Sequence, residues 1–473
     1  MAMNSLSKTV LGGAMIATLM ASSALAAGFQ RGTPDTDVLF EPGTTSLRWG
    51  LTYVDPQRGF DSIEGQSGNY DDYVQEYTIP SMSLSFGGEN LACSVHYTKS
   101  FAAEADYTGS PGGALPLQVS STQSANNADR LVASNPGAAS LSRTRTIDFE
   151  SDEFGSTCRA SYANDYGRFS LLGGVFFENF QFEGSSFGFT NLNPQIANGG
   201  PQGAFLAGLL NRSGLQATLP TRIDTNVESG FDTGWRVGAA YELPDIALRA
   251  QVLYRSEVIH DGISGTADVS VVDTAFVSVN GVRTSVPLPN VALLGIAGAG
   301  AQATAGINAT DFSASLSDVT SPQYLDVKLQ TGIAEGTLLL AAFRWTDWST
   351  NNAVVNTLSS RLGTTSSYQP YFWRDGYTGS LGIGRAFNEQ ISGALSVGYD
   401  RGVSTGAETT YTDLYSLSGG LSLKGAEWAE IRVGALVGYW TDGEQNTSEG
   451  AYFNGTVGDD VVYAGNASLK FTW

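Results

Sequence analysis

The residues of this chain best suited to acid–base chemistry are its only two histidines, His96 and His260. A catalytic nucleophile needs a base beside it and a third group that orients the base, and many hydrolases carry the nucleophile in a Gly-x-Ser-x-Gly motif. No such motif, metal-ligand pair or carboxylate cluster accompanies either histidine. We therefore expect no catalytic residue, no metal and no cofactor, and we do not expect an enzyme.

The two cysteines, Cys93 and Cys158, are the other residues with reactive side chains. They lie in neighbouring predicted strands, so they could form a disulfide outside the cytosol. The register between the strands is not readable from the sequence, and two free thiols are the alternative.

Export is indicated by the N-terminus. Lys8 precedes an apolar run over residues 10–20 and the small-residue tripeptide at 24–26, which is typical of a signal peptide over residues 1–26. A membrane-spanning helix is the alternative, but it needs about 20 apolar residues. We expect a short N-terminal segment over residues 27–44 to follow, and a barrel over residues 45–473.

Glycine and aromatic residues are abundant in the sequence, which has 57 Gly and only 15% charged residues over its full length. This composition is typical of many short strands joined by glycine-containing turns. The net charge of −21 argues against a nucleic-acid partner. The composition therefore favours an all-β protein.

The C-terminal segment alternates strictly between apolar and polar residues. One face carries Val461, Tyr463, Gly465, Ala467, Leu469, Phe471 and Trp473, and the other carries Asn466, Ser468, Lys470 and Thr472. A transmembrane strand needs this pattern, since one side meets lipid and the other a polar lumen. The final aromatic residue resembles the signature of outer-membrane barrels, through which we expect recognition by the assembly machinery.

The alternation recurs along the chain, for example over Trp235 to Tyr241, Leu171 to Phe177 and Ile147 to Phe149. We count about fourteen strands, an even number as single-chain bacterial barrels have. The connections divide into short turns and long loops, and such barrels keep the short turns in the periplasm. The sequence thus predicts a transmembrane antiparallel barrel of the outer membrane, monomeric and surrounded by lipid bilayer and lipopolysaccharide.

Basic side chains of the predicted wall point mostly inward. The inward set is Arg48, Arg159, Arg236, Arg249, Arg255, Lys328, Arg344, Arg432 and Lys470. A ligand carboxylate would find partners among them, and we name Arg255, Lys328 and Arg344 as candidates. The alternative is that these charges face inward only to avoid lipid, where each costs about 2–4 kcal/mol.

Two long loops carry apolar stretches at helical spacing. The candidate ligand-binding residues there are Phe205, Leu206, Leu209, Leu210 and Arg212 in the first loop and Val291, Leu293 and Leu294 in the second. Exposed apolar surface often marks a binding groove. The alternative is that the two helices pack on each other as a cap, and both interpretations can hold together.

Several short segments resemble the FadL/TodX family, whose members carry long-chain fatty acids and aromatic hydrocarbons across the outer membrane. These are the mature start at residues 27–30, the strand end at 53–56, the segments 321–324 and 344–349, and the run 373–377. The resemblance implies capture of hydrophobic substrate by outer loops, passage through the lumen and release through a lateral opening in the wall. Glycines at 87–88, 155 and 173–174 are candidate sites for that opening.

The family's plug, about forty residues with an Asn-Pro-Ala motif, is reduced here. Residues 32–42 could still occupy the lumen with Phe29 as an apolar anchor, and a disordered periplasmic tail is the alternative. We expect passive uptake of hydrophobic compounds, with long-chain fatty acids as the substrates that the resemblance implies. A general or hydrocarbon-selective porin-like diffusion channel is the alternative function.

Overall fold

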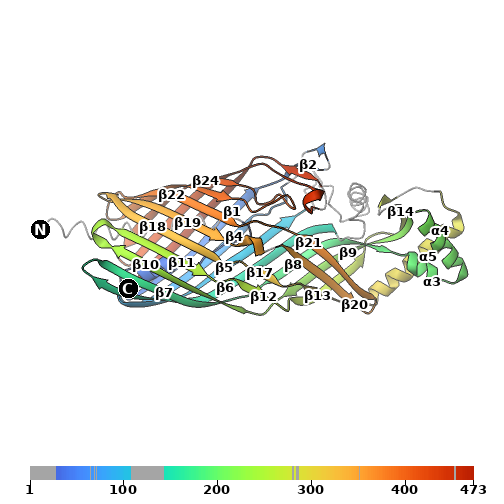
Figure 1. Cartoon of the computed structure of the whole chain (residues 1–473), viewed down its shortest axis with the longest axis horizontal. Helices are drawn as coiled ribbons and strands as arrows, with labels where there is room; N and C mark the ends of the chain where they lie inside the picture. The colour runs from blue at the N-terminus through green and yellow to red at the C-terminus, as the bar shows by residue number, and fades with distance from the viewer. Residues whose placement is uncertain are drawn as a thin grey trace.

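The computed structural model describes residues 28–63, 65–68, 70, 72–107, 143–279, 282–283, 287–350, 352–451 and 454–473. The predicted signal peptide over residues 1–26 lies outside the described residues. The described part is a closed antiparallel barrel of 14 wall strands (Figure 1), as the alternation in the sequence predicts.

The barrel closes by pairing of its first and last strands, β1 (Thr45–Gln57) and β28 (Asp460–Thr472). Around the ring from β1 the wall continues through β4 (Tyr77–Gly87), β5 (Leu91–Asp106), β6 (Arg143–Asn164), β7 (Gly167–Glu178), β10 (Asp232–Leu243), β11 (Leu248–Arg255), β18 (Tyr324–Ala334), β19 (Thr337–Thr346), β22 (Gly376–Ala386), β23 (Ile391–Arg401), β24 (Leu414–Ala426) and β25 (Ala429–Trp440). Every backbone donor of such a ring can bond within the wall, which a lipid environment demands.

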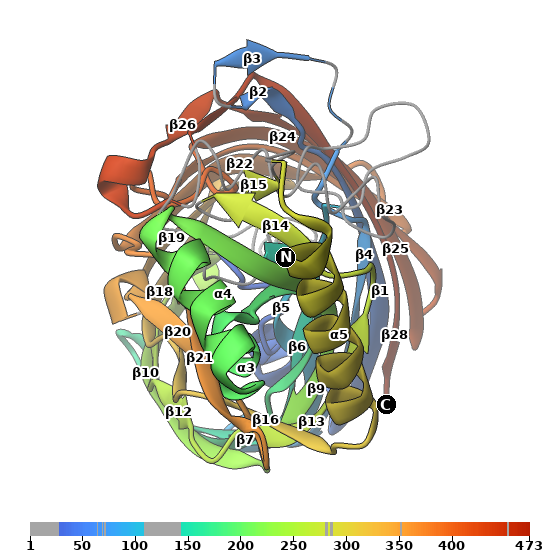
Figure 2. The same ribbon diagram turned by 90° about the vertical axis from the view of Figure 1, so that its right-hand side faces the viewer.

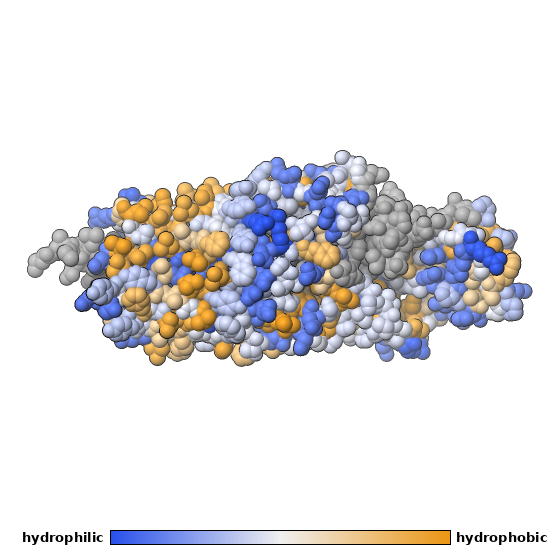
Figure 3. Space-filling view, in the orientation of Figure 1, coloured by the Kyte–Doolittle hydropathy of each residue, from blue (hydrophilic) through white to orange (hydrophobic). Residues whose placement is uncertain are grey.

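Two belts of exposed aromatic side chains encircle the wall. One belt, near the short turns, contains Phe86, Tyr162, Phe169, Phe387, Trp428 and Trp473, and the other, near the long loops, contains Tyr53, Trp235, Tyr377, Tyr399, Tyr415, Tyr439 and Tyr463. Between them the outward side chains are apolar, as in Leu171, Leu395 and Val433, and the space-filling view shows this apolar zone over one end of the molecule (Figure 3). The barrel therefore spans a membrane, with the apolar zone in its hydrocarbon core.

Six neighbouring wall strands continue beyond the outer aromatic belt as a second tier. Its strands are β8 (Gln181–Asn191), β9 (Leu215–Glu228), β13 (Ser264–Val271), β16 (Phe312–Leu316), β20 (Ala353–Ser360) and β21 (Gly363–Pro370). A separate two-stranded pair, β12 (Val258–His260) and β17 (Val319–Ser321), lies at the junction of the two tiers. The second tier extends the lumen outside the membrane.

Three helices crown the second tier: α3 (Asn193–Asn198), α4 (Pro201–Arg212) and α5 (Asn290–Asn308). They stand at the end of the molecule farthest from the short turns (Figure 1) and in front of the barrel when it is viewed from that end (Figure 2). Short strands β14 (Phe276–Val279) and β15 (Val282–Arg283) lie beneath them. A further small sheet consists of β2 (Phe60–Ile63), β3 (Gln66–Ser67), β26 (Gly443–Gln445) and β27 (Gly455–Val457).

The segment before β1 runs inside the barrel. Its 3-10 helix η3 (Thr36–Phe40) buries Val38 and Leu39 against Leu172 and Leu253 of the wall. Farther up, Arg31 and Gly32 donate backbone hydrogen bonds, both 2.8 Å, to the carbonyls of Ser100 and Lys99 in β5. We call residues 28–44 the plug segment.

Candidate functional site

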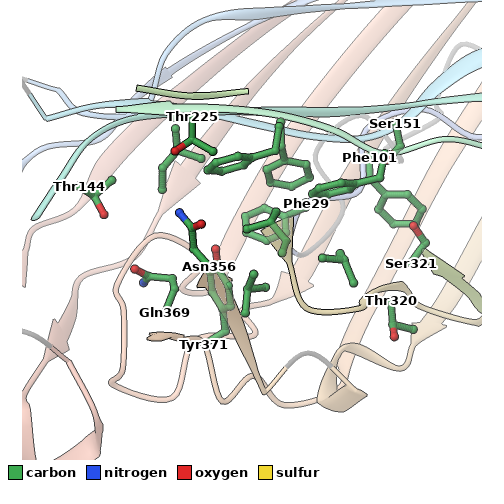
Figure 4. Close-up of a pocket in the computed structure, with 18 of the residues that line it drawn as sticks. Phe29, Phe101, Thr144, Ser151, Thr225, Thr320, Ser321, Asn356, Gln369 and Tyr371 are labelled. Carbon is green, nitrogen blue, oxygen red and sulfur yellow. The ribbon is translucent and has the colours of Figure 1, made fainter. Parts of the chain in front are cut away.

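A cavity of about 120 Å³ lies inside the barrel where the plug segment meets the second tier. Its aromatic lining consists of Phe29, Phe101, Phe149, Phe180, Phe182, Trp348 and Tyr371 (Figure 4). Hydroxyl and amide side chains complete the lining, among them Thr144, Thr225, Asn356 and Gln369. None of the described residues that line it carries a charge.

Phe29 of the plug segment is the centre of the aromatic group. Its ring centroid lies 4.5 Å from that of Phe149 and 5.6 Å from that of Tyr371, both edge-to-face. Trp348, at 6.1 Å, is also edge-to-face and is 1% exposed. These arrangements suit the ring quadrupoles and bury large apolar areas, so the plug segment forms part of the cavity wall.

The inward position of Phe149 follows from the alternation of side-chain direction along β6. On β6, Phe149, Ser151 and Glu153 face the lumen, while Phe154 faces outward and is 46% exposed. Phe149 therefore lines the cavity, and the lipid-facing assignment suggested by its sequence pattern is wrong. Phe149 faces inward because this part of β6 lies above the outer aromatic belt, where the apolar side chains face a cavity instead of lipid.

Arg255, a predicted ligand contact, is committed to a buried ion network instead. Its guanidinium contacts Glu178 at 2.5 Å and Glu153 at 3.2 Å, and Glu153 also accepts from Arg236 at 2.6 Å and contacts His96 at 2.8 Å. All of these side chains are nearly completely buried. Breaking a buried pair costs about 3–5 kcal/mol, so Arg255 serves the wall and does not await a ligand carboxylate.

Lys328 and Arg344 line a second, more polar cavity of about 260 Å³ beside the plug segment. The Arg344 guanidinium forms a two-point contact with Asp326, at 2.5 and 2.6 Å. The Lys328 ammonium lies 3.3 Å from Asp37 and its side chain is 39% exposed. Both cations therefore already have carboxylate partners, although Lys328 remains accessible from the lumen.

Acidic residues of the plug segment account for much of this pairing. Asp37 contacts Arg249 at 2.9 Å as well as Lys328, and Glu41 contacts Lys470 at 2.7 Å and also Arg48. Burial would raise the pKa of the Asp37 carboxyl, but Lys328, Arg249 and Arg48 outweigh it and the pKa lies below its usual value. The pKa of Glu41 is lowered for the same reason, mainly by Arg48 and Lys470. Ion pairs thus hold the plug segment to the wall.

His260 has contacts that invite comparison with a catalytic triad. Its Nδ1 lies 2.9 Å from Asp232, and its Nε2 lies 3.2 Å from the Ser321 hydroxyl, which lines the aromatic cavity. However, a carboxylate oxygen of Glu178 competes for the same Nε2 at 3.3 Å. The residue after Ser321 is Pro322, which has no N–H with which to stabilise an oxyanion. These contacts are better suited to linking β12 and β17 to the wall than to catalysing hydrolysis.

Neither a protein-family model nor a curated protein sequence matches the chain. Solved structures do match it in three dimensions. A Pseudomonas aeruginosa FadL homologue superposes with a TM-score of 0.57 at 15% identity, over 94% of this chain and 95% of that one. The chain has the fold of the FadL and TodX channels.

Two hydrocarbon channels give similar values. The Pseudomonas putida toluene transporter TodX has a TM-score of 0.56 at 11% identity, covering 94% of this chain and 96% of its own. The CymD monoaromatic hydrocarbon channel has a TM-score of 0.57 at 14% identity, covering 95% and 97%. The likeness extends over nearly the whole length of each chain, so it concerns the complete barrel.

In this FadL-like fold the predicted loop residues lie on the helical tip and not in either cavity. Leu210 is completely buried between the helices, and Leu206 is half-buried in the same cluster. The exposed ones are Phe205 (75%), Leu209 (43%), Val291 (72%), Leu293 (48%) and Leu294 (73%), and Arg212 is exposed beside them. The helices both pack as a cap and present apolar side chains outward.

Cys93 and Cys158 are joined by a disulfide in the structure. They lie directly opposite each other in β5 and β6, on the lipid-facing side of the wall. The bond links two strands that are already paired.

Proposed function

We propose that the protein is an outer-membrane channel for passive uptake of uncharged hydrophobic molecules. The observation that carries the proposal is the aromatic cavity between Phe29 of the plug segment and the wall, because its described lining includes seven aromatic side chains and no charge. Its volume of about 120 Å³ is close to the engineered cavity of about 150 Å³ that holds benzene. The printed descriptions of TodX and CymD, a toluene transporter and a monoaromatic hydrocarbon channel, point in the same direction.

The exposed apolar side chains of α4 and α5 would collect such molecules from outside. Phe205 and Leu294 are the most exposed large apolar residues of α4 and α5, respectively, and α5 contains no charged residue. Apolar surface in water attracts apolar solutes. The cavity would then receive them from the second tier, with the lipopolysaccharide layer bypassed.

Release would occur sideways through the seam between β4 and β5. The two strands pair only from Ser81–Thr98 to Gly87–Ala92, and Pro80, which has no N–H, marks the end of the ladder. Above it β5 shifts register at Ser100 and pairs with the plug segment instead. A Cβ on Gly32 would lie 2.6 Å from the Lys99 carbonyl oxygen, so glycine permits this close approach. Movement of the plug segment would open the seam. Of the glycines considered from the sequence, Gly87 lies at the far end of this ladder, opposite Ala92.

Long-chain fatty acids are the second candidate substrate, and the accessible Lys328 ammonium in the polar cavity favours them. A fatty-acid carboxylate would find no cation among the described residues that line the aromatic cavity, and for that reason we place uncharged molecules first. A general porin is less favoured, because the plug segment occupies part of the lumen. The proposal also includes a signal peptide over residues 1–26, a monomeric state and recognition of the C-terminal strand by the assembly machinery.

Uptake by cells tests the proposal. A Gram-negative host without channels for hydrophobic compounds should take up labelled xylene faster when it expresses the protein. Thr225→Trp, which fills the cavity, should abolish the gain, whereas Ser313→Trp on the outer face of the second tier should retain it. Equal uptake by all strains would contradict the proposal. Faster uptake of labelled oleate alone, lost in Lys328→Met, would favour the fatty-acid alternative.

A further inference from the structure

The aromatic cavity contains buried polar atoms that no described residue satisfies. Trp348 and Ser151 are each 1% exposed and both line the cavity. The Trp348 Nε1 and the Ser151 Oγ have no hydrogen-bond partner among the described residues. The Asn356 Oδ1, which is also buried in the lining, has none either.

A cavity built only for hydrocarbons would not need these groups. A buried donor or acceptor without a partner destabilises a fold, and native proteins contain few of them. The indole N–H can only donate, and the serine hydroxyl can donate or accept. Each of them suits an oxygen atom on a ligand that accepts a hydrogen bond.

Other polar side chains in or near the lining do have hydrogen-bond partners. The Ser321 hydroxyl, also in the lining, bonds to His260 at 3.2 Å, and the Ser100 hydroxyl, one strand away from Ser151, bonds to Glu178 at 2.6 Å. The Ser151 carbonyl accepts from the Ser100 hydroxyl at 3.2 Å, but the Ser151 hydroxyl and the Trp348 indole N–H have no partner among the described residues. Figure 4 shows Ser151 and Asn356 on different sides of Phe29, so polar groups meet the cavity from more than one direction.

The ligand's charge is limited by the same lining. No lysine, arginine, aspartate or glutamate is among the described lining residues. An ionised group in such surroundings would lose its hydration without gaining a counter-ion. The oxygen that the cavity accommodates should therefore belong to an uncharged group.

We infer that the aromatic cavity selects uncharged, oxygen-bearing molecules about the size of one ring, such as phenols and aromatic alcohols, over the matching hydrocarbon and the matching carboxylate. The inference rests on the proposed function and specifies its substrate class. Trp348 and Ser151 would be the residues that determine this specificity, since they offer hydrogen bonds to the ligand oxygen. The aromatic side chains around Phe29 would hold the ring.

Three probes with one skeleton test the inference: 4-methylphenol, p-xylene and 4-methylbenzoate. Their affinities for the purified protein in detergent can be measured at neutral pH, where the phenol is uncharged and the benzoate is ionised. We expect 4-methylphenol to bind about tenfold more tightly than p-xylene, from one or two net hydrogen bonds, and 4-methylbenzoate to bind most weakly. Trp348→Phe and Ser151→Ala should each reduce the advantage of the phenol by about 2- to 10-fold and leave p-xylene binding nearly unchanged.

Trp345→Phe is the matched control, because the Trp345 indole donates to Asp375 and does not line the cavity. It should retain the full preference for the phenol. Equal affinity for the phenol and the hydrocarbon, unaltered in Trp348→Phe and Ser151→Ala, would overturn this inference and leave the proposed function standing. Tightest binding of the benzoate would overturn the requirement for an uncharged ligand. Failure of all three probes to bind the wild-type protein would instead count against the proposed function itself.

Discussion

Replacement of Asp37 by Asn should release the plug segment from the wall. The Asp37 carboxylate is 5% exposed and lies between Arg249, at 2.9 Å, and Lys328, at 3.3 Å. An amide of the same shape retains the packing of η3 but removes the negative charge that both cations share. Arg249 and Lys328, on the paired strands β11 and β18, would then lie near each other with no carboxylate between them.

The size of the effect follows from the burial of the two cations. Removal of one partner from a buried ion pair costs about 3–5 kcal/mol. The side chain of Arg249 is only 9% exposed, but that of Lys328 is 39% exposed. Water therefore screens the interaction of Lys328 with Asp37 and reduces its contribution. We therefore take about 3 kcal/mol, which corresponds to roughly a 100-fold change in the equilibrium between docked and released plug segment.

Single-channel recording in planar bilayers can measure this equilibrium. The wild-type protein should show rare, brief openings, and Asp37→Asn should spend about 100-fold more time in a conducting state. Glu89→Gln is the control, because Glu89 forms an exposed pair with Arg168 at a short turn and its side chain is 83% exposed. Identical records from Asp37→Asn and Glu89→Gln, with both barrels correctly assembled, would refute the role of the ion pairs in holding the plug segment.

Three further predictions concern the plug segment, the wall and the tip. The pKa values of Asp37 and Glu41 are lowered in the docked state, so docking is stabilised above about pH 4 and weakens as the pH falls below that value. Channel openings should therefore be more frequent at pH 3 than at neutral pH. An unchanged frequency of openings would contradict this. A variant with Cys93→Ser and Cys158→Ser should lose about 2–4 kcal/mol of unfolding free energy in urea titrations but bind ligand normally, whereas impaired binding would show a role in the cavity. Leu294→Asp should slow uptake by cells several-fold without affecting ligand affinity in detergent, and unchanged uptake would exclude the tip from capture.

The barrel itself was predictable from the sequence because a wall strand has only two environments. Alternation such as that from Val461 to Trp473 directly reports lipid on one side and lumen on the other, and the structure confirms the 14 strands. The short turns were equally clear from residues such as Gly336, which adopts a positive φ of 65°.

The site was much less predictable, because outside the membrane the alternation of apolar and polar side chains along a strand no longer distinguishes the outer face from the lumen. Phe149 belongs to an apolar pattern like that of the lipid face, yet it lines the cavity above the outer belt. Trp348 follows a strand end and gives no periodic signal at all. The family resemblance included Phe29 in segment 27–30 and Trp348 in segment 344–349, but it did not indicate that the two side chains line one cavity.

The ion-pair partners of the basic residues were not predictable, for a different reason. The alternation correctly placed Arg255 and Arg344 in the lumen. The carboxylates that neutralise them come from a more distant wall strand, as with Glu178, or from the directly opposite position of the neighbouring strand, as with Asp326. Such pairing depends on register, which alternation alone does not determine. Pro80 is a signal that the sequence analysis did not use: proline has no N–H, and its position in the sequence could have indicated the end of a strand ladder at the β4–β5 seam.

The most direct measurement of the central claim is a crystal structure of the protein soaked with 4-iodophenol, with the iodine located by its anomalous scattering. The account predicts one principal site in the aromatic cavity, between Phe29 and Trp348. Iodine found only on the helical tip or the lipid-facing wall, with the cavity empty, would contradict it.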